Sequence, residues 1–124
     1  MKRYVHASSF QKIDYVKFTT ALKRELSEVL PDDAVIQIQP QYDMIRVSDT
    51  DLSTYQFKTA LADAVSNAGY SVYMFPEDNR FAAVSDNDAW ASIEFLHVEW
   101  EDMFEVYVNC DHGTVILEDW YEED

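Results

Sequence analysis

Apolar residues recur at helical spacing in two segments of the first 76 residues. In the first segment they step along the chain by three and four positions: Tyr15, Phe18, Leu22, Leu26 and Val29. The second segment has the same spacing: Phe57, Leu61, Val65 and Ala68. Such spacing places apolar side chains on one face of a helix. The pattern therefore predicts two amphipathic helices, the first ending before Pro31 and the second followed by Gly69 in a left-handed conformation.

The two predicted helices begin with copies of one sequence. Residues 13–22 read IDYVKFTTAL and residues 52–61 read LSTYQFKTAL, so Phe, Thr, Ala and Leu coincide at a displacement of 39 positions. Asp14 and Ser53 each stand where a helix needs an N-cap. Ser53 and Gln56 also match a capping box, in which side chain and backbone bond reciprocally. We therefore expect two equivalent helix starts.

Strand-like segments flank each predicted helix, and a short turn joins the middle two segments. The four segments are Arg3–Ser8, Ala34–Gln39, Met44–Ser48 and Tyr70–Phe75. The resulting order, βαββαβ over about residues 2–76, resembles the ferredoxin-like sandwich. This resemblance implies that both helices lie on one face of a four-stranded antiparallel sheet. We expect an α+β fold whose first unit, residues 1–80, is ferredoxin-like.

Residues 81–124 are predicted to form an acidic β-meander extension. Between residues 90 and 120 the pattern favours three antiparallel strands, of which Phe104–Asp111 alternates apolar and polar positions as a half-buried strand does. The segment Ser92–Trp100 is apolar on both faces, which favours a central position. The sequence leaves open whether these strands extend the first sheet or form a second one. Both parts of the chain are expected to pack into one domain.

Length and composition bound the class of protein. The chain of 124 residues is 48% hydrophobic and 15% aromatic, which predicts a globular protein with a core. No apolar run approaches the roughly 18 residues that a membrane span needs, and the first residues lack the apolar stretch of a secretory signal. A single cysteine excludes an internal disulfide, which fits a reducing compartment. The expected location is the cytoplasm.

Negative charge is concentrated after Arg80, the last basic residue. The 44 residues that follow contain thirteen Asp and Glu and no Lys or Arg, and they carry most of the net charge of −15. They are also rich in aromatic and β-branched residues, unlike a disordered acidic tail, so we expect these acids on folded structure. Such a charge argues against direct binding of nucleic acid or of anionic membranes. A basic protein partner is the natural complement.

Carboxylates on strands can form a regular acidic surface. Alternate residues of a strand lie roughly 6.6 Å apart on one face and adjacent strands lie about 4.8 Å apart, so a sheet can present carboxylates as a grid that resembles spaced phosphates. Aromatic residues would add anchor points. The candidate partner-binding residues are Asp86, Asp88, Glu94, Glu99, Trp100, Glu101, Asp102, Glu105, Tyr107, Glu118, Asp119, Trp120 and Tyr121. The competing interpretation is a solvated face that keeps a small protein soluble.

Other candidate chemistry has less support in the sequence. Cys110 and His112 have a spacing that matches no established zinc site, and a negative field raises the pKa of a thiol rather than activating it. Residues 49–51 and 86–88 resemble fragments of a calcium loop but lack the glycine and distal glutamate of an EF-hand. No glycine-rich phosphate loop, hydrolase elbow or metalloprotease motif is present. We therefore expect no catalysis, no metal site and no cofactor.

In size, composition and charge distribution the chain resembles the small acidic phage-encoded proteins that inhibit host defence, including anti-CRISPR and anti-restriction DNA mimics. The resemblance implies a non-enzymatic inhibitor in the cytoplasm of the host cell. Such an inhibitor would occupy the basic nucleic-acid-binding site of an effector such as a CRISPR nuclease or a restriction enzyme. Two alternatives stay open: an antitoxin or immunity protein that neutralises a basic partner, and an acidic domain that forms homo-oligomers through exposed strand edges.

Overall fold

The computed structural model describes residues 4–6, 13–48, 51–74, 78–85, 89–110, 114–116 and 121–123, the three shortest segments by their backbone alone. Its helices are α1 (Tyr15–Val29) and α2 (Thr54–Asn67). Its strands are β1 (Tyr4–His6), β2 (Val35–Gln39), β3 (Met44–Ser48), β4 (Ser71–Met74), β5 (Arg80–Val84), β6 (Trp90–Val98), β7 (Met103–Asn109), β8 (Thr114–Ile116) and β9 (Tyr121–Glu123). Two 3₁₀ turns, η1 (Pro40–Tyr42) and η2 (Glu99–Glu101), join β2 to β3 and β6 to β7.

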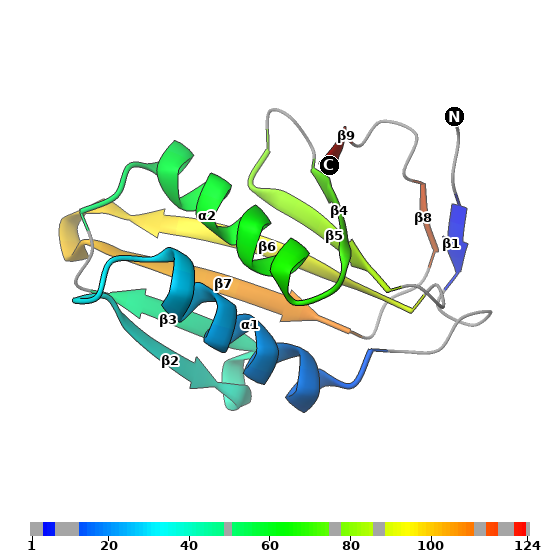
Figure 1. Cartoon of the computed structure of the whole chain (residues 1–124), viewed down its shortest axis with the longest axis horizontal. Coiled ribbons are helices and arrows are strands. Elements are labelled where there is room, and N and C mark those ends of the chain that lie inside the picture. The colour runs from blue at the N-terminus through cyan, green and yellow to red at the C-terminus, as the bar shows by residue number, and fades with distance from the viewer. Residues whose placement is uncertain are drawn as a thin grey trace.

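Seven of these strands form one antiparallel sheet in the order β2-β3-β7-β6-β5-β4-β9 (Figure 1). β1 and β8 pair with each other in a separate two-stranded sheet. The fold is therefore α+β, as expected. The question that the sequence left open has an answer for β6 and β7, because both strands lie in the centre of the main sheet and extend it.

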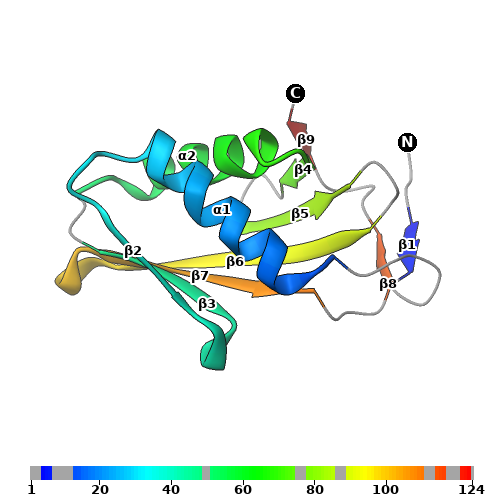
Figure 2. The same cartoon turned by 60° about the horizontal axis from the view of Figure 1, so that its bottom comes forward.

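Both helices cover the same face of the sheet and lie side by side (Figure 2). Their inward residues have no exposed surface: Phe18, Leu22 and Leu26 from α1, and Phe57, Leu61 and Val65 from α2. Phe57 stacks on Phe104 of β7, with ring centroids 3.9 Å apart and planes at 4°. Phe18 meets Tyr70 edge to face at 4.9 Å. The predicted buried faces of both helices are confirmed.

The helix ends follow the sequence signals. The Asp14 carboxylate accepts a hydrogen bond from the Lys17 N–H at 3.0 Å. Ser53 Oγ accepts from the Gln56 N–H at 3.1 Å, and the Ser53 N–H donates to Gln56 Oε1 at 2.8 Å, which completes the capping box. Gly69 follows α2 with a φ of +101°, a left-handed conformation that L side chains rarely adopt.

The ferredoxin-like strand order is not confirmed. In that order the first strand would lie beside the third, but β1 pairs with β8, and the second neighbour of β3 is β7. The repeated unit is instead a helix followed by a hairpin: α1-β2-β3 and α2-β4-β5. The β6–β7 hairpin lies between the two units. On each side of it the second strand of the unit (β3 or β5) comes first and the first strand (β2 or β4) lies farther out. The sequence repeat is thus an αββ repeat rather than a βαβ repeat.

The strand that this prediction missed is β5. Its residues Phe81, Ala82, Ala83 and Val84 are all buried. A strand covered on both faces gives a short apolar run without alternation, which is a weak signal in sequence. Because β5 was not expected, the pairing of the second helical repeat was assigned to the wrong strands.

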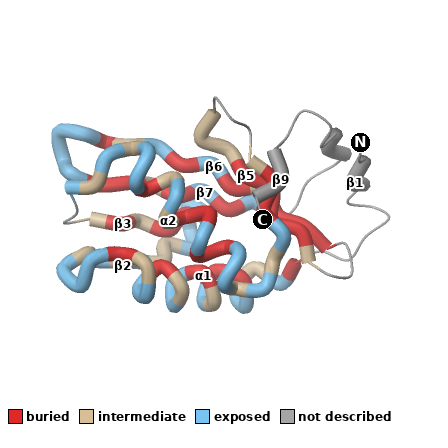
Figure 3. The backbone as a smooth tube through the Cα atoms, turned by 45° about the horizontal axis from the view of Figure 1, so that its top comes forward, coloured by how far each residue is buried: buried red, intermediate tan, exposed pale blue. Residues whose placement is uncertain are grey.

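Buried positions continue along the inner sides of both helices and through the central strands (Figure 3). Residues from both parts of the chain enter one core, from Ile13 before α1 to Val108 on β7. Within the described ranges, neither helix combines the length and the apolar character that a membrane crossing requires.

Candidate partner-binding surface

The face of the sheet that points away from the helices is the first place where the predicted site residues meet. Ile45, Phe95, Phe104 and Val106 belong to the core on the helix side, so the alternate residues of the same strands point the other way. We call this the outer face and define it by Gln37, Arg46, Arg80, Glu94, Leu96, Glu105 and Tyr107. Cross-strand pairing joins Gln37 to Arg46, Arg46 to Glu105, Glu105 to Leu96, Tyr107 to Glu94 and Glu94 to Arg80.

The expected grid of carboxylates is not found on the described part of the outer face. Glu105 has Arg46 as a cross-strand neighbour, and Glu94 has Arg80. Each glutamate is therefore bordered by an arginine rather than by another acid. Both acids of the outer face were correctly expected on strands, but Glu99, Glu101 and Asp102 lie outside the strands.

Glu99 and Glu101 were expected on a strand and lie instead in η2, the turn between β6 and β7. The apolar pattern runs on to Trp100, but β6 ends at Val98 and the chain reverses through Asp102, whose φ is +48°. The Asp102 N–H closes the turn on the Glu99 carbonyl at 3.2 Å. Asp adopts a left-handed backbone conformation more readily than most non-glycine residues do, which explains why this turn needs no glycine.

This turn presents its side chains to solvent, and we call Glu99, Trp100, Glu101 and Asp102 the acidic tip. All four are exposed, and Trp100 is 85% exposed. The Glu101 carboxylate lies 3.9 Å from the Arg46 guanidinium, with both side chains partly in solvent. An ion pair so open to water contributes only about 0–1 kcal/mol, so it leaves Glu101 free to exchange partners.

Further acids lie at the same end of the molecule. The α1–β2 connection carries Asp32 and Asp33, and the residues before α2 include Asp51; all three are exposed. Figure 1 shows both connections at the end of the sheet where the β6–β7 turn projects. We call these three residues together with the acidic tip the acidic end. Reasoning from the charge after Arg80 missed them, although alternating strand directions bring these connections together.

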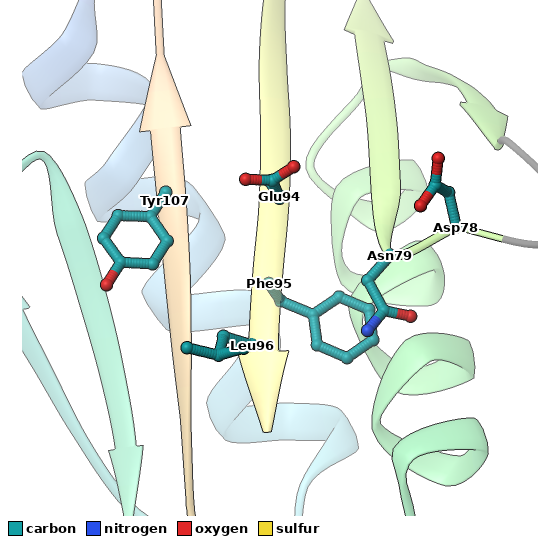
Figure 4. A pocket seen from close by; sticks show the side chains of 6 residues that line it. All are labelled: Asp78, Asn79, Glu94, Phe95, Leu96 and Tyr107. Atoms are coloured by element: carbon teal, nitrogen blue, oxygen red, sulfur yellow. The ribbon is translucent and has the colours of Figure 1, made fainter. Parts of the chain in front are cut away.

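A shallow pocket of about 350 Å³ opens on the outer face (Figure 4). It is lined by Asp78, Asn79, Glu94, Phe95, Leu96 and Tyr107. The Phe95 N–H donates to the Asn79 carbonyl at 3.0 Å, which joins two of the lining residues. Asp78 is engaged by Arg80 through two bonds to one carboxylate oxygen, at 2.8 and 3.2 Å.

Tyr107 borders this pocket and is held by a neighbouring acid. Its hydroxyl donates to Glu105 Oε1 at 3.0 Å. Burial raises the pKa of Tyr107, and the hydrogen bond to Glu105 and the charges of Glu105 and Glu94 raise it further. The hydroxyl therefore stays protonated at neutral pH and is committed to Glu105, which leaves the ring of Tyr107 as its contribution to the pocket.

Cys110 is half-buried at the end of β7. Burial raises the pKa of its thiol to about 11, with added contributions from the charges of Asp14 and Asp43. The direction agrees with the expectation of an unreactive thiol, although burial is the larger cause. Its proposed neighbour His112 lies outside the described residues.

The imidazole of His97 is held by packing and by one hydrogen bond. His97 Nδ1 lies 3.0 Å from Thr54 Oγ1, and its ring stacks on Phe104 at 4.2 Å, so it joins β6 to the start of α2. Among the residues that the structure describes, no three His, Cys, Asp or Glu side chains are grouped so as to hold a metal ion.

Several predicted partner-binding residues cannot be placed on this surface. Asp86, Asp88, Glu118, Asp119 and Trp120 lie outside the described residues, and Tyr121 is described only by its backbone in β9. The described members are divided between the acidic tip and the outer face.

Comparison with known proteins finds no matching family model, no matching curated protein and no matching solved structure.

Proposed function

We propose that this protein is a non-enzymatic inhibitor that presents its acidic end to the basic nucleic-acid-binding site of a partner protein. The observation that carries the proposal is the acidic tip. There an 85% exposed tryptophan stands among three exposed carboxylates on a closed turn. An indole ring stabilises the folded state when it is buried, so the exposed ring of Trp100 adds little to the stability of the protein.

The chemistry of the acidic end fits a partner rich in Lys and Arg. Clustered carboxylates attract such a surface from a distance and raise the association rate, while a tryptophan supplies the buried contact that holds a complex together. Trp also accepts cations over its ring face. The connections that form this end contain no Lys or Arg in residues 30–34, 49–53 and 99–102.

The partner class follows from what the carboxylates would replace. A site that normally neutralises phosphates is the kind of surface that a cluster of acids can occupy competitively. An effector such as a CRISPR nuclease or a restriction enzyme has such a site, and the protein would act on it in the cytoplasm of a bacterial host. The immunity-protein alternative needs the same acids but no competition with nucleic acid.

Charge reversal at the tip tests the proposal. The tip variant is Glu99→Lys/Glu101→Lys. The control variant, which changes the net charge by the same amount, is Asp63→Lys/Ser66→Lys/Asn67→Lys. The three control positions are exposed in the last two turns of α2. Each protein is immobilised, incubated with nuclease-treated bacterial lysate and eluted from about 50 to 200 mM salt, a range in which screening increases. The captured protein is then purified for binding assays with duplex DNA as competitor.

We expect wild type and control to capture the partner, the tip variant to lose it, and duplex DNA to displace it. Retained capture by the tip variant would contradict the proposed site. Capture that DNA does not displace would favour the immunity alternative.

A second candidate function, homo-oligomerisation, is favoured by β2. This strand forms one edge of the sheet, and its residues Val35–Gln39 carry no charge. Edge strands are commonly protected by charges, and β2 has none. An antiparallel pair of β2 strands centred on Gln37 would place no like charges opposite each other.

Sedimentation over a range of concentrations should then show a dimer in wild type and in Gln41→Lys but not in Gln37→Lys. A monomer at every concentration would exclude this function.

A further inference from the structure

The pocket on the outer face has a chemistry that selects its occupant. Its rim carries the Glu94 carboxylate, and Glu105 lies one cross-strand diagonal away beside Tyr107. Asp78 is already neutralised by Arg80. No hydrogen bond or ion pair engages the Glu94 carboxylate within the described part of the chain. An anionic ligand would be repelled here, and a purely apolar ligand would leave this carboxylate poorly solvated.

The walls of the pocket favour an organic cation. Leu96 is 52% exposed on the outer face, an apolar surface on which the methylene stem of a long side chain can lie. Tyr107 is the cross-strand neighbour of Glu94 and also lines the pocket (Figure 4), so a planar cation bound there would lie near both a carboxylate and an aromatic ring. Arginine suits this arrangement better than lysine, because its guanidinium is planar, stacks on rings and binds carboxylates through two N–H groups.

The size of the pocket limits the occupant further. A volume of about 350 Å³ is at the lower end of the roughly 300–1,000 Å³ of small-molecule sites. The pocket is therefore suited to one side chain rather than to a nucleotide-sized cofactor.

We propose that this pocket binds a single arginine side chain of the basic partner, with Glu94 as the ion-pair acceptor, Tyr107 as the stacking surface and Leu96 as the support for the stem. The assignment rests on the proposed function, because it supplies the outer face with a contact for the same partner. It adds a defined subsite, on the sheet, to the more diffuse attraction of the acidic end.

The test needs no partner protein. N-acetyl-arginine-N-methylamide is titrated into the ¹⁵N-labelled full chain, and the uncharged N-acetyl-citrulline-N-methylamide, which has nearly the same shape, is the control probe. We expect saturable shifts, in the millimolar range, of the amides of residues 78–80, 94–96 and 107 with the arginine probe only. Shifts that do not saturate, equal shifts with citrulline, or shifts centred on the acidic tip would overturn the assignment.

Three variants sharpen the titration. Glu94→Gln keeps the shape of the side chain and should weaken binding about fivefold, the loss of one exposed ion pair. Tyr107→Leu should weaken it about threefold through loss of the ring. Glu28→Gln removes an exposed acid of α1, which belongs to neither proposed site, and should leave the dissociation constant unchanged. The same spectra report whether each variant is folded. An unchanged dissociation constant in Glu94→Gln would overturn the role of that carboxylate.

The two proposals fail separately. If the arginine probe does not bind but reversal of Glu99 and Glu101 still abolishes capture, the pocket assignment is wrong and the proposed function stands. If the probe binds but capture survives that reversal, the acidic end is not the binding site and the pocket assignment stands.

Discussion

The two αββ repeats share a helix core but end in outer strands of different kinds. In both, the phenylalanine that the repeat shares, Phe18 or Phe57, is completely buried. In the first repeat the outer strand, β2, is an open edge at which Val35 is 40% exposed. In the second repeat, β9 pairs with the outer strand β4, and Tyr73 is buried there. The repeated sequence therefore specifies the helix core, whereas later segments of the chain determine how each sheet edge is covered.

The largest effect should come from the shared core. Phe18→Ala and Phe57→Ala should each lower the free energy of unfolding by about 3–5 kcal/mol, the usual cost of removing a buried ring. The loss for Phe57→Ala should lie at the upper end of this range, because the Phe57 ring stacks on Phe104 and its centroid lies 5.3 Å from that of Phe95. Chemical denaturation measures both values. A near-neutral result for one variant alone would break the equivalence of the repeats.

A smaller effect should appear at alkaline pH near the start of the first repeat. The pKa of Cys110 is about 11 in the folded protein and near its ordinary value of about 8.5 when unfolded. The unfolded chain therefore loses its thiol proton first, and stability falls as pH rises between these two values. The loss should be well below the roughly 1.4 kcal/mol per pKa unit of a fully buried group, because the thiol is partly exposed.

Denaturation of wild type and Cys110→Ala at pH 8 and pH 11 isolates this contribution. The variant should lose less stability over that interval than wild type does. Equal losses would show that the folded environment does not favour the protonated thiol.

The two helix starts should differ by a moderate amount. Ser53→Ala/Gln56→Ala removes both hydrogen bonds of the capping box, whereas Asp14→Ala removes the single bond to Lys17. We expect losses of about 1 kcal/mol for each, with the double variant the more affected. Thermal unfolding of both variants against wild type measures the difference. A clearly larger loss for Asp14→Ala would mean that the charge at this cap matters more than the number of bonds.

The smallest effect is expected at the open edge. Gln37→Lys places a charge on an exposed position of β2 and should change the stability of the monomer by no more than about 0.5 kcal/mol. The same variant is used to test self-association. If its stability is unchanged, the loss of a dimer can be attributed to the β2 edge and not to unfolding of the monomer. A loss of several kcal/mol would show that β2 is not an open edge.

Local features of the fold could be predicted from the sequence, and long-range pairing could not. The helices, their caps, β2 and β3 follow from periodicity and from residues such as Asp14, Ser53 and Pro31, which act within a few positions. The pairing of β3 with β7 joins residues about 60 positions apart, for example Met44 with Tyr107. No local sequence signal marks such a pair. β5 was missed because its residues do not alternate between apolar and polar.

The candidate site was predicted in part for the same reason. The candidates named between residues 94 and 107 are all exposed or half-exposed: Glu94, Glu99, Trp100, Glu101, Asp102, Glu105 and Tyr107. Their arrangement was wrong, because a turn at Asp102 ends the strand earlier than the apolar pattern does. Asp32, Asp33 and Asp51 were missed, since their place beside the acidic tip depends on the strand order.

The central position of the β6–β7 hairpin has a consequence for how the chain folds during synthesis. Each αββ unit can pair its own hairpin soon after it leaves the ribosome, but β3 and β5 then each lack a neighbour. Neither strand gains its second neighbour until residues 90–109 are made, and β3 then pairs with β7 through contacts of high sequence separation, which form slowly. We expect nascent chains that stop before residue 103 to expose the inner edge of β3 and to depend on chaperones until the hairpin emerges.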